Sequence, residues 1–298
     1  MRKITSFLCG LGIAHSLFFT ASANADWFIN QSTFTEAHKY LLENRTDQAF
    51  EAIVEAWQQS PSVDQQTNLN NLLDLAISED CGHSLDKTVL PTWLSKLSIE
   101  RAVVQNLNQQ ILKLSIVGLT RVKIEQITFT KYPNYSLIDE APVIDDGGYF
   151  TVEANKLDHK VEAGLYKLSI VAKGKPVWNK WVVLNEPPAK QTLGWKDSNS
   201  WRIDQVKELN TTCPSPILSV KMYDLNDTDW RPLWSEEVDT HLPTKLPKLH
   251  IPEGRYWLDV GLIQSRWQGE LSILDVQSIT RPIDYLDDDD VSELEKPL

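Results

Sequence analysis

The spacing of apolar residues changes once along the chain, from a helical period to a strand period. Between residues 31 and 98, apolar side chains recur every three or four positions, as they do on one face of an α-helix. This pattern predicts three helices, separated by the polar stretch 44–46 and by Ser60-Pro61. Their apolar faces carry Phe34, Ala37, Tyr40 and Leu41 in the first helix, Ala49, Phe50, Ile53, Ala56 and Trp57 in the second, and Leu69, Leu72, Leu73 and Ala76 in the third.

The ends of the helical region have their own signals. Thr33 and Glu36 have the Thr-x-x-Glu spacing of a capping box, which pairs two backbone N–H groups of a first helical turn. A short fourth helix is expected from about Trp93 to Leu97.

The first two predicted helices place small and aromatic residues as a tetratricopeptide repeat does. Small residues let paired helices approach closely, and larger ones fill the gaps between turns. Residues 33–61 therefore resemble one such repeat, although Thr33 and Glu36 stand where the pattern prefers Trp and Leu. A single repeat cannot bury its own face, so we expect it to pack against the rest of the chain; an ordinary helical hairpin is the alternative. The matching positions are Ala37, Tyr40, Ala49, Ile53, Ala56 and Pro61.

From Ile99 onward, apolar and polar residues alternate with a period of two, which predicts half-buried β-strands. Asp145-Asp146-Gly147-Gly148 reads as a turn between two of these strands. The predicted strands of this region are 111–117, 121–130, 149–152, 162–171 and 177–184.

A phrase of this strand-rich region occurs twice. Gly164 is followed by the order Gly-x-Tyr-x-Leu-x-Ile, and Gly254 by Gly-x-Tyr-x-Leu-x-Val. The phrase resembles the late turn and strand of secreted immunoglobulin-like or prealbumin-like sandwiches, in which the glycine makes the turn and the tyrosine packs under it. Two copies of one sandwich domain, at 99–188 and 189–282, are therefore expected.

Residues 1–25 have the pattern of a signal peptide. Arg2 and Lys3 precede an apolar run from Ile4 to Thr20, and Ala23-Asn24-Ala25 provides the small-x-small cleavage pattern. The mature protein is therefore expected in the periplasm, or secreted, with no membrane span after the leader is removed. At the other end, the acidic residues within 283–298 predict a disordered tail.

These segments together predict an α+β multidomain protein. A helical, tetratricopeptide-like head at 26–98 is expected to precede the two antiparallel β-sandwich domains.

Two cysteines remain in the expected mature chain, Cys81 and Cys213, because Cys9 leaves with the leader. An even pair in an oxidising compartment predicts a disulfide. The alternative is a reactive thiol at Cys81 beside His83.

The net charge of −12 argues against two classes of partner. A phosphate backbone repels such a chain, and no basic stripe interleaved with aromatic residues is visible, so no nucleic-acid partner is expected. An anionic lipid surface is disfavoured for the same reason.

The inventory of chemical motifs is nearly empty. No metal-ligand spacing, phosphate loop or nucleophile elbow is visible, so neither a metal nor a cofactor is expected. Ser84-x-x-Lys87 lacks the companion motifs of serine acyl-enzymes, and residues 224–229 lack the glycine and distant glutamate of a calcium loop. A pair of carboxylates for glycoside hydrolysis stays open.

Tryptophan is unusually abundant, with 11 residues. Four lie in polar, loop-like segments where exposed indoles could stack on sugars or anchor a protein partner. The simpler alternative is that they fill the junction between domains. These four are Trp195, Trp201, Trp230 and Trp234; His38 and Tyr40 of the helical head complete the candidate surface.

The layout of leader, short helical head and strand-rich body resembles an uncharacterised family of secreted proteins from Gram-negative gammaproteobacteria, a domain of unknown function. The resemblance implies the periplasm and no established activity. We expect a non-catalytic interaction, assembly or sensing protein with a protein partner in the cell envelope. The alternatives are a glycan- or peptidoglycan-binding module that uses the loop tryptophans, and an envelope hydrolase.

Overall fold

The computed structural model describes residues 32–154, 157–186, 191–205, 212–227 and 231–285. The predicted signal peptide, Trp230 and most of the predicted acidic tail lie outside these residues. Within them, no helix combines the length and the apolar character needed to cross a membrane.

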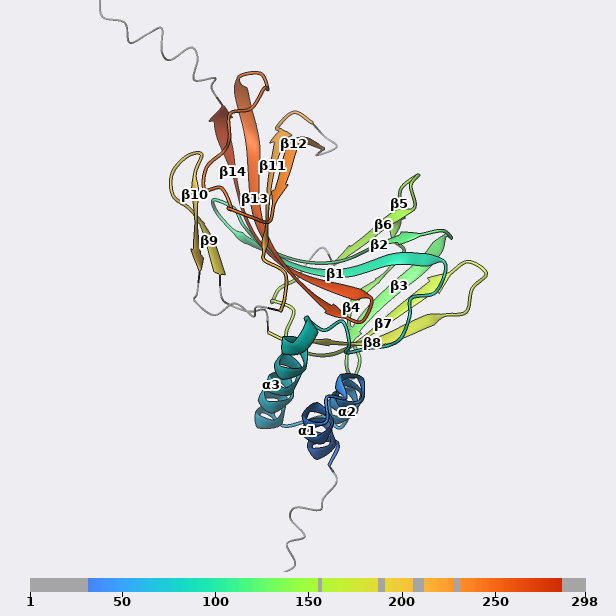
Figure 1. Cartoon of the computed structure of the whole chain (residues 1–298). Coiled ribbons are helices and arrows are strands. Elements are labelled where there is room, and N and C mark those ends of the chain that lie inside the picture. Colours follow the sequence, from blue (N-terminus) through green and yellow to red (C-terminus); the bar gives the residue numbers. More distant parts are fainter. Residues whose placement is uncertain (1–31, 155–156, 187–190, 206–211, 228–230, 286–298) are drawn as a thin grey trace, which may run out of the picture. The chain divides into compact units, whose positions relative to one another are not determined.

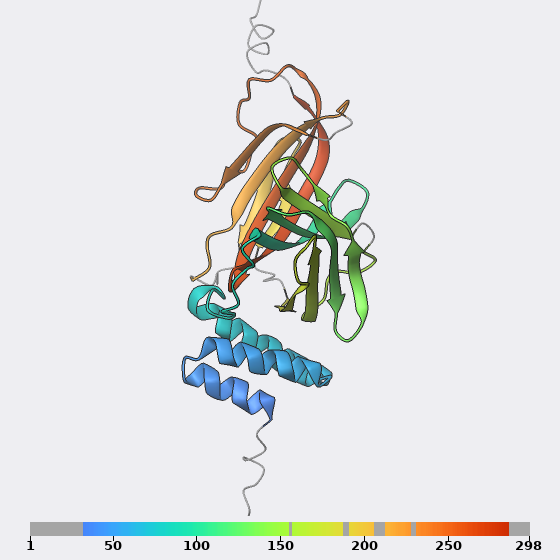
Figure 2. The ribbon, with the colours of Figure 1, turned by 90° about the vertical axis from the view of Figure 1, so that its right-hand side faces the viewer.

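Three helices form the N-terminal part: α1 (Thr33–Leu42), α2 (Thr46–Gln58) and α3 (Val63–Asp80). Figure 2 shows them stacked side by side as one layer. The N-cap of α1 is Ser32, whose side chain accepts from the Thr35 N–H, so the helix begins one residue before the predicted capping box. At the start of α3, the Ser62 N–H donates to Gln65 Oε1 at 2.8 Å.

The predicted fourth helix is wrong, because Leu94 begins a strand. Strands make up most of the chain after the helices (Figure 1): β1 (Leu94–Gln105), β2 (Gln110–Thr120), β3 (Ile124–Lys131), β4 (Tyr135–Glu140), β5 (Val143–Ile144), β6 (Tyr149–Ala154), β7 (Gly164–Ala172), β8 (Trp178–Leu184), β9 (Gln191–Trp195), β10 (Trp201–Gln205), β11 (Ile217–Asp224), β12 (Pro232–Val238), β13 (Gly254–Gln268) and β14 (Leu271–Tyr285).

The predicted fold class is also wrong. The chain is mostly β, and its helices are a small layer rather than a large repeat-like head. The strands do not form two separate sandwiches: one sheet has the order β12-β11-β13-β14-β1-β2-β6-β5, a second has β4-β3-β7-β8, and β9 pairs with β10. β14 lies parallel to β1, with Arg101 opposite Asp275, so strands from both expected sandwiches share one sheet.

The repeated phrase marks a repeated four-strand unit. The orders β4-β3-β7-β8 and β12-β11-β13-β14 are the same order of chain segments, with antiparallel neighbours throughout. In both units the tyrosine of the phrase donates its hydroxyl proton to a carbonyl four residues earlier: Tyr166 to Glu162 O and Tyr256 to Pro252 O, each at 2.7 Å. The two units differ in strand length, since β7 and β8 have 9 and 7 residues whereas β13 and β14 have 15 each.

Three apolar cores hold the elements together. The first lies between the four-stranded sheet and β1, β2 and β6, and it includes Leu271 and Ile273 of β14. The second joins the helices to β7 and β8 through Leu165 and Val183. The third covers β11, β13 and the far end of β14, under residues of β9 and β10 such as Trp201. β14 therefore contributes residues to the first core at its beginning and to the third core at its end.

β8 is the edge strand of the four-stranded sheet and pairs with β7 on one side only. On its other side, among the described residues, side chains rather than a strand bind its backbone N–H and C=O groups. Gln268 accepts from the Val183 N–H at 3.2 Å and donates to Trp181 O at 2.6 Å. Arg266 donates to Val183 O at 2.9 Å and Arg101 to Asn185 O at 2.8 Å. The edge of the four-stranded sheet is thus fixed to the eight-stranded sheet.

The tip of the β13–β14 hairpin is held by the segment that follows α3. The Trp267 N–H donates to Cys81 O at 2.9 Å, and the Gly269 N–H donates to Gly82 O at 3.0 Å. Gly82 has φ +88°, and a Cβ there would collide with the Trp267 carbonyl oxygen. Glycine is required at this position because both the backbone conformation and the close approach exclude a side chain.

Candidate functional site

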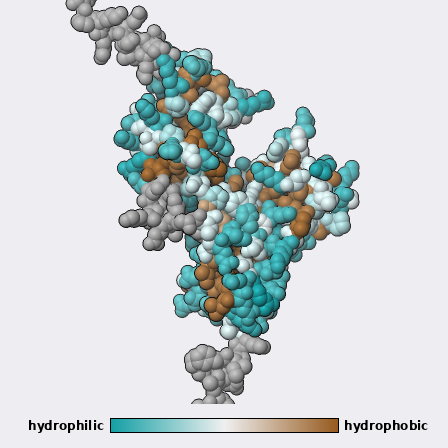
Figure 3. Space-filling view, viewed as in Figure 1, coloured by the Kyte–Doolittle hydropathy of each residue, from teal (hydrophilic) through white to brown (hydrophobic). Residues whose placement is uncertain are grey.

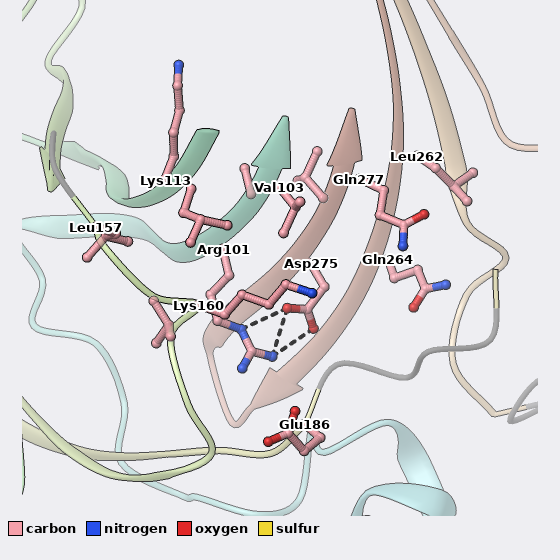
Figure 4. A pocket seen from close by; sticks show the side chains of 14 residues that line it. Arg101, Val103, Lys113, Leu157, Lys160, Glu186, Leu262, Gln264, Asp275 and Gln277 are labelled. Atoms are coloured by element: carbon pink, nitrogen blue, oxygen red, sulfur yellow. Dashed lines mark hydrogen bonds and ion pairs between the residues drawn. The ribbon is translucent and has the colours of Figure 1, made fainter. Parts of the chain in front are cut away.

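A cavity of about 220 Å³ opens on the eight-stranded sheet, along the stretch of β14 between the first and third cores. Its floor comes from neighbouring strands: Val103 of β1 lies opposite Gln277 of β14, and Gln277 lies opposite Leu262 of β13. Figure 4 shows residues from the segment 157–161 and Glu186 around the same space. Its apolar lining residues are Ala102, Val103, Leu112, Leu157, Val161, Leu262 and Val276.

A buried ion pair forms the polar part of the floor. Arg101 Nε donates to Asp275 Oδ1 at 2.7 Å, and Arg101 Nη2 donates to Asp275 Oδ2 at 2.9 Å. The two side chains are only 6% and 12% exposed. A two-point pair of this kind fixes the guanidinium plane, and the third nitrogen, Nη1, is held by Asn185 O. The pair therefore sets the registration of β1 against β14 at the pocket.

Arg266 of β13 is a second buried arginine near the ion pair. It lies two residues after Gln264, which is paired with Asp275 across the β13–β14 hairpin. Arg266 is 6% exposed, and its Nη2 donates to Val183 O. Burial, and then the nearby Arg101, lower the pKa of Arg266 to about 9. Within the described part of the chain, its Nε and Nη1 have no hydrogen-bond partner. Arg101 in the floor and Arg266 near it bring two positive charges to this region, opposed by the negative charges of Asp275 and Asp74.

The rim carries opposite charges on two sides. In Figure 4 the Lys160 side chain lies across the Arg101–Asp275 pair, whereas Glu186 lies on the other side of Arg101. Both rim residues are exposed. Lys113 also lines the pocket, but its side chain extends away from the ion pair. The site therefore combines a paired floor, an apolar lining and one lysine positioned over the opening.

A second hollow, of about 880 Å³, lies beside the β5–β6 turn. It is lined by the segments 120–125 and 141–148 and opens broadly to solvent. The pocket of about 220 Å³ is less open to solvent than this hollow, which favours the smaller pocket as a binding site.

The three candidate tryptophans that the structure describes do not form one exposed surface. Trp201 is fully buried, and its Nε1 donates to Pro243 O at 2.8 Å, so it belongs to the core. Trp195 and Trp234 are half-buried and pack against the same third core. The Arg281 guanidinium lies 4.8 Å from the centre of the Trp195 ring. Trp230 lies outside the described residues.

The two candidate residues of the helical layer lie on α1. His38 is exposed, with its ring centroid 5.5 Å from that of Phe34. Tyr40 is half-buried, and Arg45 lies 4.6 Å from the centre of its ring. Neither lies in the lining of the pocket on the large sheet.

Cys81 and Cys213 are joined in a disulfide, with a Cα–Cα distance of 4.8 Å. Cys81 ends α3, and Cys213 precedes β11. Beside the bridge, Thr212 Oγ1 donates to Ser78 O at 2.9 Å. The bond fixes the end of the helical layer to the chain that enters the eight-stranded sheet.

The pocket residues were not found by sequence reasoning. Arg101 and Asp275 are 174 positions apart, and nothing in the local pattern shows that their strands are neighbours. One signal was available: Arg101 stands at an inward position of β1, next in the alternation after the apolar Leu97 and Ile99. A charge at such a position requires a partner.

The opposite face of the large sheet carries two half-buried carboxylates, Glu100 and Asp259. Burial raises the pKa of Glu100, although Lys221 and Lys113 act to lower it. Burial also raises the pKa of Asp259, against a hydrogen bond from Ser278. A carboxylate whose pKa is raised in the folded state reduces the stability of that state at neutral pH.

We expect Glu100→Gln to raise the melting temperature at pH 7. The folded state holds the Glu100 proton more tightly than the unfolded state, so the cost of ionisation is present above the folded pKa. That cost disappears as the pH falls below about 4, where the carboxyl is protonated in both states. Melting temperatures of Glu100→Gln and of the wild type, measured between about pH 4 and pH 7, test this prediction. The control is Glu237→Gln, which makes the same change at an exposed position of β12. A gain that persists unchanged in acid would contradict the ionisation argument.

Large apolar side chains at the surface are scattered rather than gathered. The brown areas visible in Figure 3 are separated by hydrophilic residues. Such scatter is ordinary for a protein surface and does not mark a broad apolar interface. The exposed residues include Leu42, Val63, Leu75, Val89, Val143 and Leu233.

Comparison with known proteins gives a family without an assigned role. A family model described as "Protein of unknown function (DUF2861)" matches residues 27–284. No curated protein matches the chain.

Three solved structures show distant similarity. One is a tetra-tandem repeat in the extending region of a large adhesion protein, with 12% identity, 62% of this chain and 49% of that chain covered, and a TM-score of 0.19. Another is Tp47, the 47-kilodalton lipoprotein of Treponema pallidum, with 11% identity, 67% and 53% covered, and a TM-score of 0.23. The third is the BSP domain of a biofilm-associated protein, with 8% identity, 75% and 56% covered, and a TM-score of 0.17. The matches span about half the length of these structures, and TM-scores this low support no functional argument.

Proposed function

Because the chain belongs to the DUF2861 family of proteins of unknown function, we propose a role from its own geometry. It is a non-catalytic interaction protein that works outside the cytoplasm, in the periplasm or as a secreted protein. Its pocket on the eight-stranded sheet holds a small apolar group of a ligand or of an envelope protein.

The pocket is the observation that carries this proposal. An apolar concavity with a few fixed polar groups is the usual form of a binding site. At about 220 Å³ it has room for roughly seven water-sized groups, at about 30 Å³ each. That is below the size of a drug-like ligand and suits a short alkyl chain or one apolar side chain.

The rigidity of the walls supports binding rather than chemistry. Arg101 and Asp275 neutralise each other, and each is held by two or more hydrogen bonds or ion-pair contacts. Groups that are locked in this way provide shape and electrostatic potential without exchanging protons. The expected leader and the disulfide support a compartment outside the cytoplasm, where disulfides persist.

Filling the pocket tests the proposal. We expect the wild type to bind hexanamide, a neutral probe of suitable length, and to return it chemically unchanged. Val103→Trp should abolish the saturation-transfer NMR signal of this probe, because the indole occupies the space above β14. The control is Val143→Trp, which places the same side chain on β5 at a position that is 79% exposed.

Thermal melts of both variants establish that they are folded. Equal binding by wild type and Val103→Trp, or conversion of the probe into a product, would contradict the proposed function.

A further inference from the structure

The pocket has a charge preference that the proposed function leaves open. Of its charged lining residues, Arg101 pairs with Asp275, Lys160 and Glu186 lie on two sides of the rim, and Lys113 extends away from the ion pair. The Arg266 guanidinium near Arg101 adds a positive charge at this place, in a chain whose net charge is −12. A local field opposite to that of the whole molecule selects one sign of ligand.

The buried arginines strengthen this field. Asp275 takes up the charge of Arg101, but Arg266 donates only to a neutral carbonyl, Val183 O. Its Nε and Nη1 have no partner among the residues described, and the side chain is almost fully buried. A cation in this position acts through a low-dielectric interior, where its potential is screened less than at the surface.

Lys160 is the group that can meet a ligand directly. Figure 4 places its side chain across the Arg101–Asp275 pair, over the apolar floor. It forms no ion pair within the described residues, and its ammonium group can contact a ligand that leaves its alkyl part on Val103 and Leu262.

We infer that the pocket binds a carboxylate that carries a short alkyl chain. This inference rests on the proposed function and names its ligand class. The alkyl part lies on the apolar floor, and the carboxylate accepts from Lys160 Nζ at the rim. Two sources offer this chemistry: a free short-chain carboxylate, and the C-terminal apolar residue of a protein chain.

A matched pair of probes isolates the charge. Hexanoate and hexanamide have the same number of heavy atoms and differ in one formal charge. We expect hexanoate to bind the wild type about fivefold more tightly, because one partly exposed charge contact is worth up to about 1 kcal/mol. The preference should fall as salt is raised from about 50 mM to about 500 mM, since exposed charges are screened.

Three single substitutions separate the direct contact from the general field. Lys160→Gln should reduce the preference for hexanoate to about twofold or less, and Glu186→Gln should increase it, because the two rim charges have opposite signs. Lys113→Gln is the matched control: it removes the same charge from another residue that lines the pocket, one whose side chain extends away from the pair (Figure 4), so the preference should change less than about twofold.

A peptide distinguishes the two sources. The tripeptide Gly-Gly-Leu is titrated with a free and with an amidated C-terminus. Selective binding of the free form supports a protein C-terminus as the ligand, and binding of hexanoate alone supports a free carboxylate.

Equal affinity for hexanoate and hexanamide would overturn the inference while leaving the proposed pocket function intact. Tighter binding of hexylamine than of hexanoate, or loss of hexanoate preference in both Lys160→Gln and Glu186→Gln, would also overturn it. Failure of all the probes to bind the wild type would instead reject the proposed function itself.

Discussion

Asp275→Leu is expected to lower the free energy of unfolding by about 3–5 kcal/mol, because it leaves the buried Arg101 guanidinium without its counter-charge. Arg101 is 6% exposed, so water can do little to replace the lost counter-charge. Chemical denaturation followed by tryptophan fluorescence measures the effect, and the many tryptophans provide the signal.

A double-mutant cycle separates the cost of an orphaned charge from the value of the pair. Arg101→Met alone should also be strongly destabilising. Arg101→Met combined with Asp275→Leu should be less destabilising than either single change, because no unpaired charge is then left buried. It should still fall short of the wild type by about 1–3 kcal/mol, because Asn185 O loses its donor.

The same strand provides the control. Asp284 of β14 pairs with Arg255 at 3.9 Å, but the two side chains are 79% and 67% exposed. Asp284→Leu should therefore change stability by less than about 1 kcal/mol. Similar losses at positions 275 and 284 would show that the pair at the pocket is not the connection between strands that its burial implies.

Removal of the disulfide, by Cys81→Ser together with Cys213→Ser, is expected to have an effect of comparable size. The bond closes a loop with a sequence separation of 132 residues. Loop-closure entropy at this length corresponds to about 5 kcal/mol, and residual structure in the unfolded chain reduces the measured value to about 3–5 kcal/mol. The loss should be seen in urea denaturation as a lower midpoint.

Two comparisons identify the cause. The wild type in dithiothreitol should match the double-serine variant, and peptide mapping without reduction should recover Cys81 linked to Cys213. A variant within about 1 kcal/mol of the oxidised wild type would show that the contacts around Trp267, Gly82 and Thr212 hold the segment without the covalent bond.

Local sequence patterns predicted local structure well wherever neighbours along the chain decide it. The helical period of residues 34–57 became α1 and α2, and the Gly-x-Tyr phrases became two turns in which a tyrosine hydroxyl binds a carbonyl four residues earlier. The short stretch at Trp93 misled the prediction, because five residues do not distinguish a helix turn from the start of a strand.

The assembly of these elements was predicted less well. A repeated phrase suggested two complete sandwiches, yet the second four-strand unit extends a sheet that also contains β1, β2 and β6. Alternation within β14 tells which residues share a face, but it does not tell which strand lies beside it. The fifteen residues of β14 are long enough to contribute to two cores, and the pocket lies along β14 between those cores.

By itself, the sequence determined the positions of α1 to α3 and of β2, β3, β6, β7 and β8, the apolar faces of the helices, and which cysteines could pair. These properties follow from steric preferences and periodicity over a few residues. Only the tertiary structure decided that β1 and β14 are neighbours, that Arg101 meets Asp275, and that the loop tryptophans belong largely to a core. Contacts between residues more than 100 positions apart depend on how whole elements fill space together, and no local pattern contains that information.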